Sequence, residues 1–98
     1  MKITKKQDGS ALVIALEGRL DTTTAPDLEK ELKTSLDGVT DLTLDLTNLD
    51  YISSAGLRVL LSTHKTMMKQ GQMKLTNASD IVKEVFDVTG FSDILTIE

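Results

Sequence analysis

The N-terminal residues contain two stretches that favour strands, with a turn signal between them. Ile3-Thr4 and the run at 11–16 (ALVIAL) are rich in residues that favour strands, and Asp8-Gly9 separates the two segments. Such a pair between apolar segments is typical of a tight hairpin turn. The pattern predicts two antiparallel strands, the second of which ends at Gly18.

The next segment has the spacing of an amphipathic helix. Its apolar residues recur every three or four positions, at Ala25, Leu28, Leu32 and Leu36. Thr24 is placed to cap this helix, and Pro26 and Asp27 suit its first turn. Gly38 then closes the segment.

Strict alternation follows at residues 42–47, where leucine occupies every second position between threonine and aspartate. This pattern predicts a strand with one apolar face. A second helix, ending near Gly71, has an apolar stripe made of Leu57, Leu60, Leu61, His64 and Met68. Residues 72–75 are expected to form a short strand.

The C-terminal part predicts one more helix and one more strand. Ser79 can cap the helix and Gly90 can stop it. Its apolar face consists of Ile81, Val82, Val85, Phe86 and Thr89, and residues 94–97 are expected to form the last strand.

This order of elements predicts an α/β fold with a largely parallel sheet and right-handed crossovers. Because residues 42–47 are apolar on one side only, the helices should gather mainly on one face of the sheet. We therefore expect a small, singly wound βα layer with a mixed, mostly parallel sheet and an antiparallel N-terminal strand.

Composition narrows the possible functions. The 98 residues suit one domain, 1–98, and 11 basic against 15 acidic residues give a net charge of −4. This charge disfavours nucleic acid and anionic membrane as partners. The absence of cysteine and the single histidine leave no thiolate or histidine-rich metal site, and no cofactor is expected. Without an apolar leader or a run of about 20 apolar residues, the protein is expected to be cytoplasmic.

Residues 45–58 join a strand to the second helix, which is where open α/β sheets place their sites. Ser53 and Ser54 fall at the position of a helix cap, which is worth about 1 kcal/mol. The free N–H groups and the helix dipole also make this position suitable for a phosphate. Two hypotheses stay open at this point: an ordinary cap, or a phosphorylation switch that excludes a docked partner.

Three stretches together resemble a known family. The run 46–57 (LTNLDYISSAGL), the stretch 18–21 (GRLD) and the stretch 85–91 (VFDVTGF) are similar to motifs of STAS-domain anti-sigma factor antagonists, the anti-anti-sigma factors. The resemblance covers essentially the whole chain and implies a single STAS domain.

The resemblance also implies a partner-switching function. In this family the unphosphorylated antagonist binds an anti-sigma factor that is also an ATP-dependent serine kinase with a histidine-kinase-like fold, and a sigma factor is released. The kinase inactivates the antagonist by phosphorylating the signature serine, and a PP2C-type phosphatase removes the phosphate.

Carried over to this chain, the phosphoacceptor is Ser54, with Ser53 as the fallback. Asp21 matches the acidic residue of the G-x-L-D motif. The implied partner-binding residues are Asp21, Thr22, Ser53, Ser54, Gly56, Leu57 and Arg58. Ser53 stands where the family has aspartate, and Ala55 where it has serine or threonine. The missing aspartate keeps a second hypothesis open, an unphosphorylated scaffold or ligand-sensing module in another regulatory complex, whereas the loss of the hydroxyl at Ala55 simplifies the site.

Several residues also have a plain structural explanation. Gly56 can allow a partner's close approach or tight packing of the first helical turn. Asp21 can contact a partner or satisfy N–H groups of its own loop. Asp45 can hydrogen-bond the loop or lie on a solvated face. Met67 and Met68 are expected in the core. Lys65 and Lys69 are expected to be solvated helix residues, with partner contact as the second possibility.

An enzymatic role is disfavoured. A hydrolase nucleophile elbow needs glycine two residues before the serine, and Ile52 stands there. His64 lies about 15 Å along the same helix from Ser54, beyond the reach of a general base, and is expected to be a packed or half-buried residue. A phosphate-binding loop of the kind found in NTPases is absent from the sequence.

Overall fold

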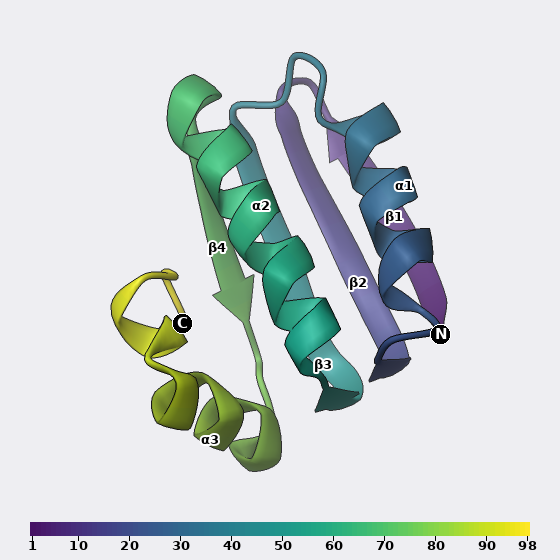
Figure 1. Ribbon diagram of the computed structural model, residues 1–98. Coiled ribbons are helices and arrows are strands. Elements are labelled where there is room, and N and C mark those ends of the chain that lie inside the picture. The colour runs from purple at the N-terminus through teal and green to yellow at the C-terminus, as the bar shows by residue number, and fades with distance from the viewer.

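Strand order in the sheet follows chain order, β1-β2-β3-β4 (Figure 1). The computed structural model describes all 98 residues. The elements are β1 (Lys2–Asp8), β2 (Ala11–Leu20), α1 (Ala25–Ser35), β3 (Asp41–Ile52), α2 (Ser54–Gln70), β4 (Gln72–Thr76), α3 (Asp80–Thr89) and a 3₁₀ turn (Phe91–Asp93). β1 is antiparallel to β2, and the other neighbouring pairs are parallel, so the predicted mixed sheet is confirmed.

The β1–β2 hairpin turns at Gly9. Asp8 pairs with Ala11, which leaves Gly9 and Ser10 in the loop. Gly9 has φ 62°, in the left-handed region that a type II′ turn requires at its first loop position. The turn predicted from Asp8-Gly9 is therefore confirmed.

The core lies on one face of the sheet. Leu42, Leu44 and Leu46 are completely buried, whereas Thr43 and Asp45 alternate with them and face the other way. In Figure 1, α1 and α2 lie side by side across the apolar face, and α3 lies beyond the end of the sheet next to β4. The predicted gathering of helices on one face is confirmed.

Local sequence signals set most of the helix ends. The Ser79 hydroxyl accepts a hydrogen bond from the Val82 N–H at 3.2 Å, and Gly90, with φ 80°, ends α3. Pro26 lies in the first turn of α1, as predicted, but the Thr24 side chain makes no capping bond there. None of the helices is both long enough and apolar enough to cross a membrane.

Both strands that lead to the candidate site are longer than predicted. β2 continues past Gly18 to Leu20, and β3 continues past Thr47 to Ile52. Two register shifts interrupt the β2–β3 pairing, and Gly18 adopts φ 102° at one of them. Such irregularities break the alternation of apolar and polar residues, so the sequence pattern does not predict where these two strands end.

The strand expected at residues 94–97 is not formed. The 3₁₀ turn at Phe91–Asp93 occupies the preceding residues, and only Ile97 bridges Leu75 of β4. Two hydrogen bonds hold this contact, from the Leu75 N–H to the Thr96 carbonyl and from the Glu98 N–H to the Leu75 carbonyl. The C-terminal segment thus follows β4 for too short a distance to be a strand.

The apolar faces predicted for α2 and α3 are confirmed only in part, because some of their predicted core residues are exposed. Met67 is buried in α2 while Met68 is 69% exposed, and Val82 is buried in α3 while Ile81 is 62% exposed. Successive helical residues point about 100° apart, so one member of an adjacent apolar pair is left outside the core. The buried face of α2 consists of Gly56, Leu57, Val59, Leu60, Thr63 and Met67.

Candidate functional site at the start of helix α2

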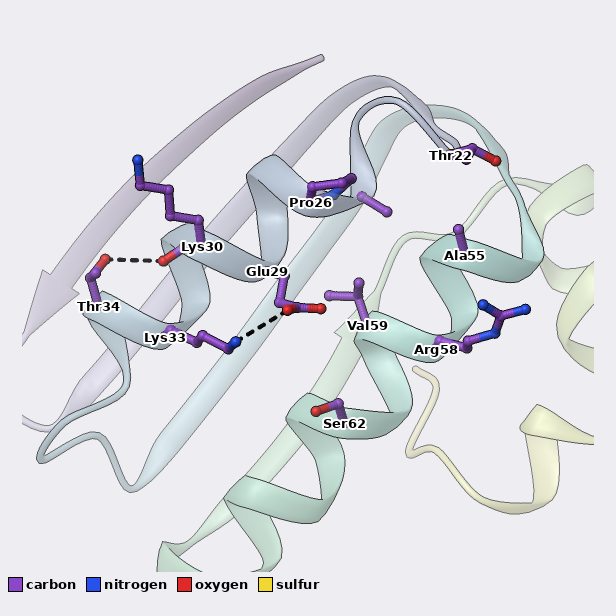
Figure 2. Close-up of a pocket in the computed structure, with 11 residues that line it drawn as sticks. Thr22, Pro26, Glu29, Lys30, Lys33, Thr34, Ala55, Arg58, Val59 and Ser62 are labelled. Carbon is purple, nitrogen blue, oxygen red and sulfur yellow. Dashed lines mark hydrogen bonds and ion pairs between the residues drawn. The ribbon is translucent and has the colours of Figure 1, made fainter.

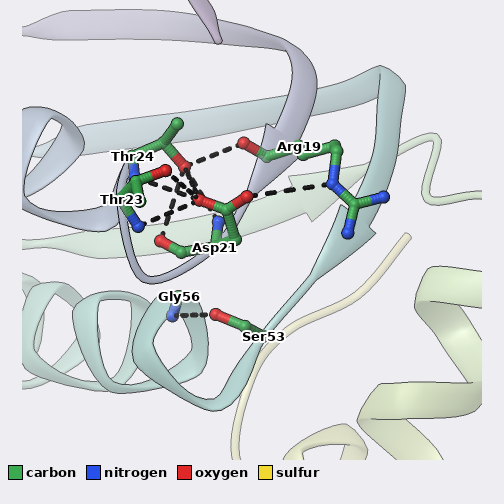
Figure 3. A network of polar contacts seen from close by, with 6 residues as sticks. All are labelled: Arg19, Asp21, Thr23, Thr24, Ser53 and Gly56. Atoms are coloured by element: carbon green, nitrogen blue, oxygen red, sulfur yellow. Dashed lines mark hydrogen bonds and ion pairs between the residues drawn. The ribbon is translucent and has the colours of Figure 1, made fainter.

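The ends of β2 and β3 meet at the start of α2. Leu20 pairs with Ile52, and the Ser53 N–H donates a hydrogen bond to the Leu20 carbonyl at 2.8 Å. Figure 3 shows the loop that follows β2 directly beside the first turn of α2. The two groups of implied binding residues, Asp21 and Thr22 after β2 and those from Ser53 to Arg58 at the start of α2, are therefore neighbours in space.

The two serines have different structural roles. Ser53 is the N-cap of α2, and its hydroxyl accepts a hydrogen bond from the Gly56 N–H at 3.3 Å (Figure 3). Ser54 is the first residue of the helix, is exposed, and its hydroxyl has no hydrogen-bond partner within the chain. Of the two hydroxyls, the one at Ser54 is unengaged and open to solvent.

Gly56 and Leu57, in the first turn of α2, are buried and do not form the surface of the site. A Cβ atom on Gly56 would lie 2.7 Å from Leu20 Cγ and 3.0 Å from Ile52 Cγ1, so only glycine lets this turn approach the strands so closely. Leu57 is 5% exposed and belongs to the core. The tight-packing explanation of Gly56 therefore fits the structure, and neither residue is exposed on the surface around Ser54.

Asp21 organises the loop between β2 and α1 (Figure 3). Its carboxylate accepts hydrogen bonds from the Thr23 hydroxyl at 2.8 Å, the Thr23 N–H at 3.0 Å and the Thr24 N–H at 3.2 Å. The Thr23 hydroxyl, followed by the two N–H groups, holds the pKa of Asp21 below its usual value of 3.8. Asp21 thus satisfies loop N–H groups, as the structural explanation predicted, while remaining half-exposed beside Ser53.

Thr24 is also used differently from the prediction. Its hydroxyl accepts from the Asp21 N–H at 2.8 Å and donates to the Arg19 carbonyl at 2.8 Å. The loop is therefore closed on itself by two side chains. The first N–H groups of α1 have backbone acceptors instead: the Ala25 N–H donates to the Asp21 carbonyl and the Asp27 N–H to the Thr24 carbonyl.

An exposed cation lies next to this loop. The Arg19 guanidinium sits 4.4 Å from the centre of the Tyr51 ring, and Arg19 Nε is 3.8 Å from Asp21 Oδ2. A cation–π contact at an exposed position contributes about 0.5–1 kcal/mol, and a surface ion pair about 0–1 kcal/mol. These contacts orient Arg19, and they place its positive charge and the negative charge of the Asp21 carboxylate at the edge of the site.

A groove of about 730 Å³ runs between α1 and α2 and opens at the site (Figure 2). Thr22, Ala55 and Arg58 line the end nearest Ser54. Within the groove Lys33 pairs with Glu29 at 3.2 Å, whereas Arg58 is exposed and extends from α2 on the side away from α1. The predicted surface residues Thr22 and Arg58 are therefore accessible and flank the serines.

A second polar network joins β3 to the loop after β4. The Asp45 carboxylate accepts hydrogen bonds from the Thr47 hydroxyl, the Thr47 N–H and the Asn77 amide. The Thr47 hydroxyl is the main cause that lowers the pKa of Asp45. Asn77 has φ 59°, so Asp45 helps to fix a left-handed loop position. The loop hydrogen bond expected for Asp45 is present.

Sequence reasoning missed the threonines of both networks and the Arg19–Tyr51 contact. Asp21 and Asp45 are each followed two residues later by threonine, which is the spacing of a local side-chain turn and was the available signal. Arg19 and Tyr51 are far apart in sequence, and only the strand register places them opposite each other.

Comparison with known proteins covers nearly the whole chain. The family model of the STAS domain matches residues 2–98. BtrV of Bordetella bronchiseptica, which bears the name of an anti-sigma factor antagonist, is 39% identical over 99% of this chain and 85% of its own length. The anti-sigma-B factor antagonist of Bacillus subtilis is 33% identical over 99% of this chain and 90% of its own length.

Solved structures agree with the fold. An anti-sigma factor antagonist from Mycobacterium paratuberculosis superposes with a TM-score of 0.88 at 21% identity, covering 98% of this chain and 83% of that one. Bacillus SpoIIAA in its phosphorylated form superposes with a TM-score of 0.77 at 20% identity, covering 99% and 91%. At such identities the likeness concerns the fold. Together with the family model and the relatives above 30% identity, it confirms the predicted family: the chain belongs to the STAS domain family.

Proposed function

We propose that this chain is an anti-sigma factor antagonist that binds an anti-sigma factor when Ser54 is unmodified and releases it when Ser54 is phosphorylated. The observation that carries the proposal is the difference between the two serines. Ser54 offers an exposed, unbonded hydroxyl, whereas the Ser53 hydroxyl is engaged in the helix cap. The names of the relatives support the antagonist role.

Phosphorylation at Ser54 suits a switch that leaves the fold intact. A phosphate adds about −1.5 to −2 charges, and the start of a helix offsets part of this by about 0.3–1 kcal/mol. A partner docked over Ser54 has no such compensation, and burying the unpaired charge there costs about 3–5 kcal/mol. At 1.4 kcal/mol per decade, affinity falls by roughly a hundredfold to several thousandfold.

The proposed binding surface consists of exposed or half-exposed residues around Ser54. They are Asp21 and Thr22 from the loop after β2, and Ser53, Ser54 and Arg58 from the start of α2. Gly56 and Leu57 are left out because they are buried. The proposed partners are an anti-sigma factor with serine kinase activity and a histidine-kinase-like fold, and a PP2C-type phosphatase.

In this proposal the chain is a substrate of enzymes rather than an enzyme, and residues 1–98 act as one STAS domain in the cytoplasm. Ile52 occupies the position where a nucleophile elbow has glycine, and this argues against hydrolase chemistry at Ser54.

The proposal is tested by mass spectrometry of the intact chain and its peptides, isolated from its own cells under several growth conditions. We expect an added phosphate of about 80 Da on Ser54, and its loss in the Ser54→Ala variant. The same preparations, made from a tagged Ser54→Ala chain, should copurify an ATP-binding anti-sigma factor that mass spectrometry identifies.

One observation favours a second candidate function. Ser53 stands where the family pattern has aspartate, a change that suits an unmodified scaffold or ligand-sensing module. Absence of phosphate under every growth condition, together with copurification of a large assembly or a small ligand, would support this candidate. Phosphate on Ser53 alone would keep the switch but move its position.

A further inference from the structure

The exposed side of α2 carries a row of three cations. With about 100° between successive helical residues, Arg58, Lys65 and Lys69 point within about 40° of one another. They point away from the buried face of the helix, all three are exposed, and none takes part in an ion pair or side-chain hydrogen bond of the chain. The row begins one turn after Ser54 and extends for about 16 Å.

The charge of α2 sets it apart from the rest of the molecule. The chain has 15 acidic and 11 basic residues, yet α2 has no acidic residue. The other helices mix both signs: α1 has Asp27, Glu29 and Glu31 beside Lys30 and Lys33, and α3 has Asp80, Glu84 and Asp87 beside Lys83. A basic face on one helix of an acidic protein is therefore a local feature.

Two features of this arrangement oppose the stability of the helix, whereas Lys69, in the last turn, lies at the negative end of the helix dipole and favours it. Arg58 lies near the N-terminal, positive end of the helix dipole, and no acidic residue in the first turn offsets it. Lys65 and Lys69 are four residues apart, a spacing at which like charges repel each other. No acidic residue of the first turn offsets Arg58, and such a local conflict points to function rather than to folding.

We propose that the row of Arg58, Lys65 and Lys69 is an electrostatic docking surface for an acidic face of the anti-sigma factor. The inference rests on the proposed function and extends it, because the row continues the proposed binding surface from Ser54 along the whole exposed side of α2. Opposite charges across an interface accelerate association and fix its orientation, and salt weakens both effects.

The row also gives phosphorylation a second way to act. A phosphate of about −1.5 to −2 charges at Ser54 stands one helical turn before Arg58 and cancels half or more of the row's three positive charges. The acidic partner then meets a surface that no longer attracts it, in addition to the local cost of covering the phosphate.

The test is the association rate with the anti-sigma factor identified by copurification, measured at about 50 mM and about 500 mM salt. The variant is Lys65→Glu with Lys69→Glu, and Lys65→Gln with Lys69→Gln is a milder version. The matched control is Lys2→Glu with Lys6→Glu, which changes net charge equally but lies on β1, where Lys6 pairs with Val13 on the face of the sheet away from α2.

We expect the α2 glutamate variant to associate about 10–100-fold more slowly at low salt, with the glutamine variant in between. At high salt the differences should largely vanish, and the β1 control should stay within about twofold of the unmodified chain. Equal slowing by the α2 and β1 variants, or no slowing by either, would overturn the docking row while leaving the switch at Ser54 intact. Failure of the unsubstituted chain to bind at all would instead reject the proposed function itself.

Discussion

Two neighbouring serines at the start of α2 differ in the hydrogen bonding and in the exposure of their hydroxyl groups. The Ser53 hydroxyl is committed to the Gly56 N–H, and the Ser54 hydroxyl is free. A helix start distinguishes these positions because the cap residue must point its oxygen back at the first turn, whereas the next residue points outward. A phosphate on Ser54, as proposed, would therefore leave the cap in place.

Substitution of the two serines should separate stability from modification. Ser53→Ala removes the cap and should lower the free energy of unfolding by about 1 kcal/mol, while Ser54 stays a phosphate acceptor. Ser54→Ala should leave stability unchanged within about 0.5 kcal/mol and abolish the phosphate. Urea unfolding and mass spectrometry measure the two effects, and a stability loss confined to Ser54→Ala would contradict the assigned roles.

Ser53→Asp is the informative conservative variant. Aspartate caps a helix as well as serine does and restores the residue that the family pattern has at this position. We expect unchanged stability and faster phosphorylation of Ser54 by the copurified kinase and ATP. Slower phosphorylation would show that the missing carboxylate does not limit the rate at which Ser54 is phosphorylated.

At the scale of elements, the site depends on how closely α2 approaches the ends of β2 and β3. Gly56 makes this approach possible, because any side chain there meets Leu20 and Ile52. Gly56→Ala should therefore destabilise the chain by about 1–3 kcal/mol through overpacking, despite the better helix propensity of alanine. Ser62→Ala, at an exposed position of the same helix, is the control and should have little effect on urea unfolding.

The loop between β2 and α1 should make stability depend on acidity. Because the pKa of Asp21 is lower in the folded chain than its usual 3.8, the ionised carboxylate stabilises the fold above that pH. This contribution is lost as the pH falls through the lowered pKa. Asp21→Asn should therefore show a smaller loss of stability on acidification than the unsubstituted chain.

Thermal unfolding between about pH 6 and about pH 2.5 measures this difference. Asp50→Asn is the matched control, since Asp50 is exposed and has no ion pair or side-chain hydrogen bond in the chain. Identical acid profiles for Asp21→Asn and the unsubstituted chain would contradict the loop role of Asp21.

At the scale of the whole molecule, the sequence predicts the order of the elements well because turn and cap signals are local. Asp8-Gly9, Ser79 and Gly90 act through their own backbone neighbours, and each is where it was expected. The strand ends at Leu20 and Ile52 were missed because register shifts interrupt the alternation on which strand prediction depends.

The motifs select Ser54 and Asp21 as candidate site residues, and the structure brings them together at the start of α2. The motifs do not reveal that Gly56 and Leu57 are buried, since burial depends on how α2 packs on two strands distant in sequence. For the same reason the Arg19–Tyr51 contact has no sequence signal. Long-range packing decides which motif residues are exposed at the site.

The most direct test of the account is the affinity of the anti-sigma factor for the chain that carries phosphoserine at position 54, compared with the unmodified chain. We predict a loss of at least about a hundredfold in affinity, with an unchanged far-UV circular dichroism spectrum that shows the fold to be intact. Equal affinity of the two forms for the anti-sigma factor would contradict a switch at Ser54.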